Sequence, residues 1–235
     1  MTWTKKRGLH QPVTNAIAAH LHAEWRDRRL HTDTAYMSRF IRRRCATDLL
    51  ALDLFRGSAK EVTESEAMRE AAVRYLDLDP HDSDVMIIVP GDGGTPRTGA
   101  LLAFTTRWEV VSVDPDLRRW CDTNSASGSL TAWSCSPATI RRLTVVPHRV
   151  EDAAGRVQVE SPSKVAVLAC HSHASLDASL DVVCASYPRS QIRVAAMGCC
   201  FEQTITGRVH DAEYIDDGVA SPHRVVRIWK AAGAA

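Results

Sequence analysis

A short apolar run that ends in a glycine-rich turn most constrains what this chain can fold into. Residues 85–89 are continuously apolar (Val-Met-Ile-Ile-Val), which is typical of a strand buried on both faces. The turn Pro-Gly-Asp-Gly-Gly at 90–94 follows directly. A helix is expected next, with Thr95 as its cap and Pro96 in its first turn. A strand, a tight turn and a helix in this order indicate an α/β fold.

The rest of the chain continues this alternation of apolar runs and helical stretches. Five further runs predict strands, at residues 110–113, 143–146, 165–169, 192–197 and 225–229. A helix is expected from about Ser175, and residues 121–138, rich in Ser, Thr and Gly, are expected to form a loop. The pattern predicts a Rossmann-like, doubly wound and mostly parallel sheet.

The first part of the chain has helical rather than strand periodicity. Apolar residues recur every four positions in two series, Ile17, Leu21 and Trp25, and then Met37, Ile41, Cys45 and Leu49. The segment Thr63–Glu66 has the form of a capping box and is expected to begin a further helix. We therefore expect a helical segment at 1–82, which binds substrate or acts as a lid, and a Rossmann-like domain at 83–235.

Basic residues are concentrated at the start of the chain. The net charge is only +1, yet residues 1–60 hold 12 basic and 5 acidic side chains, against 17 and 23 in the remainder. Such a basic region indicates an anionic partner, nucleic acid first. The residues expected to bind phosphates are Arg39, Arg42, Arg43 and Arg44. The alternative is that these arginines form ordinary solvated helix faces.

The seven cysteines favour an intracellular protein. They include no Cys-x-x-Cys pair, and most lie inside apolar runs, so reduced thiols are expected rather than a secreted disulfide framework. No apolar run has the length of a bilayer span, and the first residues lack the apolar core of a signal peptide. We expect a soluble protein of the cytoplasm or nucleus with no membrane partner; the oligomeric state stays open.

The glycine turn and a later aspartate together predict a nucleoside cofactor. Glycines allow the backbone to approach a ligand, and the free amides of a helix start favour polar or negative groups. Asp114 ends the next predicted strand, where a carboxylate can accept both ribose hydroxyls. Pro96 stands where a dinucleotide fingerprint has its third glycine, and no Walker lysine follows the turn. S-adenosylmethionine is the remaining common cofactor.

At these residues the sequence resembles the S-adenosylmethionine-dependent methyltransferases, over about 84–230. The turn at 91–94 looks like their first motif and Asp114 like their ribose-binding acid, although Val89-Pro90 replaces the acidic residue frequent before the turn. The segments 170–173 and 199–200 resemble a branch with a Cys-Cys pair, some of whose members modify tRNA. The last predicted strand fits the antiparallel strand usual in these enzymes. The resemblance implies cofactor contacts at Pro90, Gly91, Asp92, Gly93, Asp114, Pro115, Cys170 and His171.

Two histidines are candidates for acid–base chemistry. His171 and His173 follow a predicted strand, and the ordinary pKa of histidine lies near neutrality, so either could accept a proton from the methyl acceptor. A zinc site formed with Cys170, Cys199 and Cys200 is the rival interpretation. We expect no metal, because the spacing matches no standard structural zinc pattern and adjacent cysteines on a strand end should point apart.

These patterns predict a methyltransferase that acts on RNA, such as tRNA or another structured RNA. The first alternative is a binding module that keeps the fold without catalysis. The second is a nicotinamide-dependent oxidoreductase, against which Pro96 weighs. The sequence does not identify the acceptor atom.

Overall fold

A computed structural model describes residues 35–55, 59–124, 140–154, 157, 162–184 and 187–231, apart from the side chains of 122–124. The strands are β1 (Val85–Pro90), β2 (Glu109–Val113), β3 (Leu143–Val146), β4 (Lys164–Cys170), β5 (Arg193–Met197), β6 (Ala212–Ile215) and β7 (Val225–Trp229). The α-helices are α2 (Ala35–Arg42), α3 (Ala46–Ala51), α4 (Ala59–Arg74), α5 (Arg97–Thr105), α6 (Arg118–Asn124), α7 (Val150–Ala153) and α8 (Leu176–Asp181). Two short 3₁₀ turns are η1 (Pro115–Leu117) and η2 (Arg189–Gln191).

The strands form one sheet in the order β3-β2-β1-β4-β5-β7-β6. Neighbours from β3 to β5 pair in parallel, whereas β7 is antiparallel to both β5 and β6. The strand order reverses between β1 and β4, which is where sheets of this kind bind ligands. The predicted Rossmann-like, doubly wound sheet is therefore confirmed, and the last strand is antiparallel as the resemblance implied.

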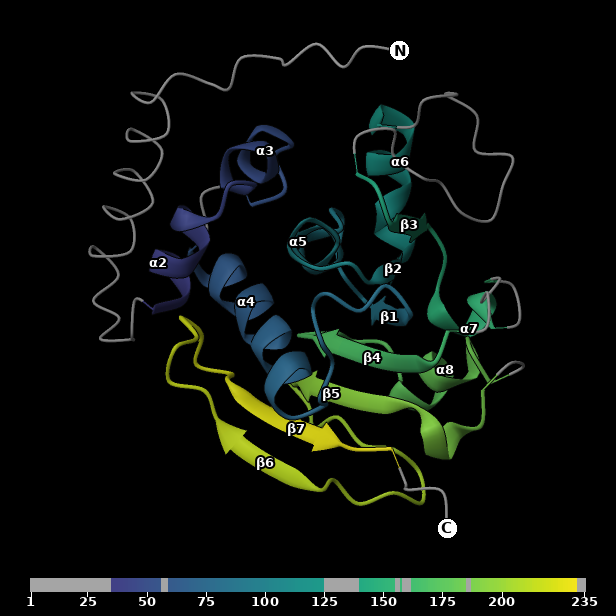
Figure 1. Cartoon of the computed structure of the whole chain (residues 1–235). Helices are drawn as coiled ribbons and strands as arrows, with labels where there is room; N and C mark the ends of the chain where they lie inside the picture. Colours follow the sequence, from purple (N-terminus) through teal and green to yellow (C-terminus); the bar gives the residue numbers. More distant parts are fainter. Residues whose placement is uncertain are drawn as a thin grey trace.

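Helices cover both faces of the sheet (Figure 1). Successive residues of β1 belong to two different cores: Val85, Ile87 and Val89 pack with α2–α5, and Met86 and Ile88 pack with α7 and α8. All six residues of β1 are buried, as the continuous apolar run predicts. This three-layer arrangement holds the loops at the carboxyl ends of the strands in fixed positions.

The helical region contains more interruptions than its periodicity predicts. The series from Met37 to Leu49 is divided between α2 and α3, because the helix ends at Arg42 and resumes only at Ala46. Phe40 rather than Ile41 is completely buried in α2. The residues before 35, including the predicted series from Ile17, lie outside the described part of the chain.

The predicted capping box is wrong. Helix α4 already contains Ala59, so Thr63 lies inside the helix and its hydroxyl donates to the Lys60 carbonyl oxygen. The same hydroxyl oxygen accepts a hydrogen bond from the Ala220 amide at 3.0 Å. Thr63 therefore connects α4 to the loop before β7 instead of starting a helix.

Three further expectations are corrected. Residues 121–124 belong to α6 rather than to a loop, and most of the remaining predicted loop is outside the described residues. The sequence interpretation missed β6, an edge strand with alternating burial. Cys121 is disulfide-bonded, so reduced thiols are not the rule throughout, although five described cysteines are free.

None of the described helices has the length and apolarity that a membrane span requires.

Candidate functional site

The glycine turn and Asp114 lie side by side because the register of β1 and β2 places them there. Pro90 pairs with Val113, so the residues that follow each strand emerge together at the carboxyl edge. The Gly91 amide donates to the Val113 carbonyl oxygen at 2.7 Å, and Gly91 has a φ of +65°. The Gly93 amide donates to Asp114 Oδ2 at 3.0 Å. The turn is thus tied to the predicted ribose-binding acid.

Asp114 keeps capacity to bind a ligand. Its Oδ1 accepts a hydrogen bond from the Asp116 amide at 2.8 Å, in addition to the bond from Gly93. A carboxylate offers about four acceptor directions, and these two bonds fix its orientation while leaving the others. The side chain is half-buried at the end of β2. This is a suitable arrangement for an acceptor of two neighbouring hydroxyls.

Gly91 allows the turn after β1 to pack closely against Ser172. A Cβ atom at this position would lie 2.3 Å from Ser172 Oγ and 3.2 Å from Ser172 Cα. Ser172 follows β4, so the two loops at the reversal of strand order pack directly against each other. At Gly93, by contrast, the nearest atom is the mobile end of the Arg97 side chain, at 2.9 Å. Gly94 is the turn residue with the most space, since its nearest atom is the Asp116 carbonyl oxygen at 3.9 Å, and it lines the cleft described below.

Asp92 supports α5 instead of replacing the acid that usually precedes the turn. Its carboxylate accepts hydrogen bonds from the Thr98 and Gly99 amides, both at 2.9 Å, and from Ser112 Oγ at 2.8 Å. It therefore satisfies the free amides at the start of the helix, which corrects the prediction that Thr95 is the cap. Burial raises the pKa of this carboxyl to about 7, and the hydrogen bonds oppose that shift.

Sequence reasoning missed the glycine that brings α5 close to the sheet. A Cβ on Gly99 would lie 2.0 Å from Ser112 Oγ in β2. Close helix–strand packing is the role of the third glycine in a dinucleotide fingerprint, and Gly99 fulfils it three residues after Pro96. The signal was a glycine inside a predicted helix, where glycine is otherwise unfavourable.

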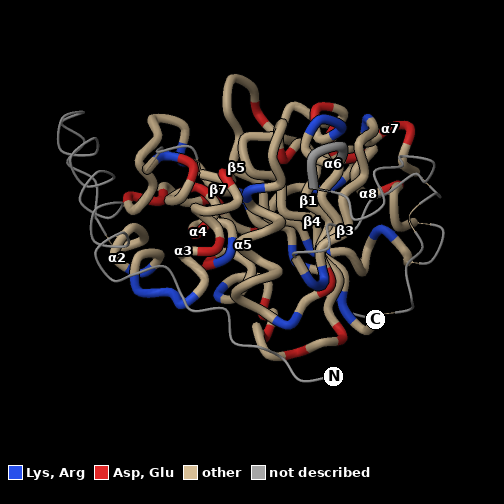
Figure 2. The backbone as a smooth tube through the Cα atoms, turned by 90° about the horizontal axis from the view of Figure 1, so that it is seen from above, with Lys and Arg blue, Asp and Glu red and all other residues tan. Residues whose placement is uncertain are grey.

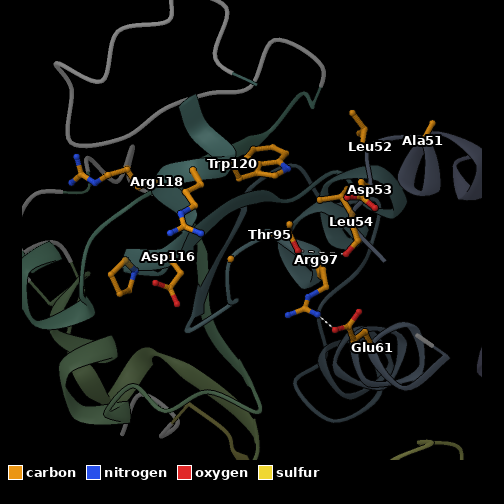
Figure 3. Close-up of a pocket in the computed structure, with 13 residues that line it drawn as sticks. Ala51, Leu52, Asp53, Leu54, Glu61, Thr95, Arg97, Asp116, Arg118 and Trp120 are labelled. Carbon is orange, nitrogen blue, oxygen red and sulfur yellow. Dashed lines mark hydrogen bonds and ion pairs between the residues drawn. The ribbon is translucent and has the colours of Figure 1, made fainter. Parts of the chain in front are cut away.

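A cleft of about 870 Å³ opens beside the turn and Asp114 (Figure 3). It has the volume of a small-molecule site. The arginine of α5 and an acid of α4, Arg97 and Glu61, form an ion pair at its edge. The lining residues are Ala51, Leu52, Asp53, Leu54, Glu61, Gly94, Thr95, Arg97, Pro115, Asp116, Arg118, Arg119 and Trp120. Of the predicted cofactor residues only Pro115 belongs to this lining. Asp114 and the turn residues 90–93 do not, but Gly94 at the end of the turn and Asp116, whose amide binds Asp114, do. The stretch 51–54, which sequence reasoning did not single out, forms the opposite wall.

The residues predicted after β4 contact other parts of the chain. His171 has a φ of +49°, and its Nε2 lies 2.9 Å from Oε1 of Glu64 in α4, without the angles of a hydrogen bond. Burial, reinforced by the carboxylates of Glu64 and Asp92, raises the pKa of the Cys170 thiol well above its ordinary value. A protonated thiol is a poor nucleophile, so this shift disfavours nucleophilic chemistry at Cys170. Neither residue lines the cleft.

His173 lies with the two adjacent cysteines. Cys199 Sγ and Cys200 Sγ are 3.5 Å apart, and Cys200 Sγ is 3.6 Å from His173 Nε2. The expectation that the adjacent thiols point apart is therefore wrong. The reason is that β5 already ends at Met197, so both cysteines lie in a turn rather than on the strand. His173 is exposed and is not part of the cleft lining.

The predicted phosphate-binding arginines divide into two pairs. Arg39 Nη1 lies 2.6 Å from Glu70 Oε2, and Arg43 binds both carboxylate oxygens of Glu66, at 2.5 and 2.7 Å. These pairs connect α2 and the turn that follows it to α4. Figure 2 marks the charged positions of these segments along the backbone. The remaining two, Arg42 and Arg44, are exposed. Half of the predicted cluster thus has a structural role.

Comparison with known proteins shows likeness of fold alone. No family model and no curated protein matches the sequence. The structure of MtNAS in complex with MTA and tNA is 13% identical, covers 81% of this chain and 66% of that chain, and has a TM-score of 0.46. A mutant of MtNAS in complex with S-adenosylmethionine is 12% identical. The match covers 93% of this chain and 79% of that chain, with a TM-score of 0.46. A mutant of the 16S rRNA (adenine(1408)-N(1))-methyltransferase from Catenulisporales acidiphilia is 17% identical. The match covers 56% of this chain and 61% of that chain, with a TM-score of 0.27.

Proposed function

We propose that this chain is an S-adenosylmethionine-dependent methyltransferase. The observation that carries the proposal is the hydrogen bond from the Gly93 amide to Asp114, which joins a glycine turn to an acid at the neighbouring strand end. Both lie at the carboxyl edge, next to the reversal of strand order between β1 and β4. An 870 Å³ cleft adjoins them. The antiparallel β7 agrees with the resemblance found in the sequence.

The residues present fit a nucleoside with a polar tail. Asp114 would accept the ribose hydroxyls, and the turn would face the ligand with Gly94, where no atom lies nearer than 3.9 Å to a Cβ position. Pro115 and Trp120 offer apolar surface in the cleft for an adenine ring. Three arginines and three acids line the same cleft, which gives polar partners of both signs for an amino acid tail. Pro90 and Asp92 would contribute through the backbone of the turn only.

The cofactor supplies an activated methyl group, and the chain's own task is alignment. Rigid placement of a nucleophile next to such a group supplies much of the rate without a proton-transfer residue. The contact of His171 with Glu64 is therefore compatible with this activity. His173 is exposed beyond β4 and does not line the cleft, so the proposal gives neither histidine a proton-transfer role.

Calorimetric titration with S-adenosylmethionine, S-adenosylhomocysteine and NAD tests the proposal. We expect the first two to bind in the micromolar range, with about −8 kcal/mol, and Asp114→Ala to abolish this binding. Asp152→Ala, an exposed acid in α7, is the matched control and should bind normally. Binding of NAD alone would favour the oxidoreductase alternative. If none of the three ligands bound, the glycine turn would have only a structural role, and the alternative of a binding module without catalysis would be favoured.

RNA is the acceptor that the charge distribution favours. Arg42 and Arg44 are exposed around the end of α2, and α3, which follows, ends at Ala51 in the wall of the cleft. Exposed arginines beside a cleft could bind phosphates while the acceptor base enters it. These two side chains replace the larger predicted cluster, since Arg39 and Arg43 are paired with acids of α4.

The RNA proposal is tested by charge reversal of the exposed arginines only. We expect Arg42→Glu with Arg44→Glu to weaken binding to structured RNA and to flatten its salt dependence by about one unit of slope per lost phosphate contact. Arg107→Glu, an exposed residue before the opposite end of β2, is the control and should leave binding unchanged. Unchanged RNA binding in the double variant would remove the support for RNA.

A further inference from the structure

We propose that His173, Cys199 and Cys200 form a zinc site with one open coordination position. Their ligand atoms all lie within 4.8 Å of one another, and the described residues contain no other such His, Cys and acid group. Two thiols and an imidazole are the preferred ligands of Zn²⁺. The group lies beyond the carboxyl ends of β4 and β5 and is separate from the cleft of the proposed cofactor site.

The distances already match those of a tetrahedral ion. With Zn–S bonds of about 2.3 Å and Zn–N bonds of about 2.0–2.1 Å, tetrahedral geometry separates two sulfurs by about 3.8 Å and a sulfur from a nitrogen by about 3.6 Å. Here the two sulfurs are 3.5 Å apart, and Cys200 Sγ is 3.6 Å from His173 Nε2. Small side-chain rotations would bring the three ligands around one ion.

The surrounding chain holds the two ligand loops together. The buried Gln203 side chain donates to the Ser172 carbonyl oxygen at 2.6 Å, which fastens the cysteine turn to the histidine loop. The Phe201 ring packs edge-on against the His173 ring, with centroids 5.6 Å apart. The turn itself is tight, since the Phe201 carbonyl oxygen would lie 2.8 Å from a Cβ on Gly198. Such contacts orient ligands before the metal binds.

Three protein ligands at an exposed position leave the fourth for water or for a small ligand. Cys200 and His173 are exposed and Cys199 is partly exposed, so solvent reaches the group. Zinc sites with three protein ligands are open sites rather than closed structural ones. The proposal stands independently of the methyltransferase assignment.

Cobalt substitution tests the site. The full chain, kept reduced and stripped with a chelator, is titrated with Co²⁺ and then with Zn²⁺. We expect one equivalent of Co²⁺ to give thiolate-to-cobalt charge-transfer absorption, which Zn²⁺ then abolishes. Replacement of both cysteines (Cys199→Ser with Cys200→Ser) should remove the absorption, and His173→Ala should weaken binding by about tenfold or more. Cys184→Ser and His81→Ala, which alter residues outside the group, are controls and should bind as the wild type.

A second measurement on the wild type keeps the test independent of how the variants fold. Alkylation of each cysteine is measured by mass spectrometry with and without Zn²⁺. We expect Zn²⁺ to protect Cys199 and Cys200, while Cys184 reacts at the same rate in both conditions. The proposal would be overturned if no cobalt–thiolate absorption appeared, or if it persisted in the double cysteine variant. Equal alkylation of Cys199 and Cys200 with and without Zn²⁺ would overturn it as well.

Discussion

At the scale of single residues, Asp92 couples the stability of the turn to pH. Burial raises the pKa of its carboxyl in the folded chain from 3.8 to about 7, so the folded state binds a proton that the unfolded state has lost. This stabilisation is fully present below pH 3.8, the pKa of the carboxyl in the unfolded chain. It is lost as the pH rises through about 7, the pKa in the folded chain. We therefore expect the free energy of unfolding to fall by about 3 kcal/mol between pH 5 and 8, because each pH unit between 5 and about 7 costs about 1.4 kcal/mol.

Denaturant unfolding at several pH values checks this expectation against Asp92→Asn. The asparagine cannot titrate, so the difference in unfolding free energy between wild type and variant should change across this range. Parallel pH profiles for the two proteins would show that Asp92 is not the titrating group.

Gly91 tests the close approach between the two loops at the reversal of strand order. Gly91→Ala combines an unfavourable φ of +65° with a contact of 2.3 Å to Ser172 Oγ. We expect it to lower the free energy of unfolding by about 2 kcal/mol or more. Gly207 has a φ of +75° with no atom within 4 Å, so Gly207→Ala isolates the backbone cost. Equal losses in the two variants would show that Ser172 does not limit the space at Gly91.

At the scale of elements, one ion pair fixes the turn after α2 against α4. Arg43 donates two hydrogen bonds to Glu66, whose side chain is completely buried. Arg43→Ala would leave that carboxylate without its partner, and we expect a loss of about 3–5 kcal/mol. Arg42→Ala, at the exposed neighbour, should change stability by less than about 0.5 kcal/mol. Thermal and denaturant unfolding measure both, and similar small effects would contradict the structural role of Arg43.

The strands were more predictable than the helices for a physical reason. A strand buried on both faces needs an apolar run, which is continuous in β1, β4 and β5 and broken by a single polar residue in β2, β3 and β7. The edge strand β6 has alternating polar residues and was missed for that reason. The break between α2 and α3 falls at residues 43–45, and the apolar periodicity alone does not reveal it. Glu66 looked like part of a cap because its partner, Arg43, is distant in the sequence.

At the scale of the whole molecule, the helical and Rossmann-like parts share one core. Residues of α2, α3 and α4 pack in the same cluster as alternate residues of β1, β4 and β5. We therefore expect the full chain to unfold in one transition and a fragment of residues 83–235 to lack cooperative unfolding, because the part of the sheet face that α2–α4 cover would be exposed. Calorimetry and circular dichroism measure this. Two transitions, or a stably folded fragment, would show that the segments are independent domains.

Part of the candidate site follows from sequence because parallel strands bring their carboxyl ends to one edge. Asp114 and the glycine turn were predicted on this ground, and their hydrogen bond agrees with it. The opposite wall at 51–54 depends on how the helical segment packs, and no local pattern reveals it. The inward direction of the Asp92 carboxylate and the approach of the two thiols likewise depend on three-dimensional packing.

A crystal structure with S-adenosylhomocysteine tests the central claim most directly. The account predicts that the ribose hydroxyls lie within hydrogen-bonding distance of the Asp114 carboxylate, with the ligand between the glycine turn and the wall at 51–54. A ligand bound elsewhere, or bound in this cleft without contact to Asp114, would contradict it.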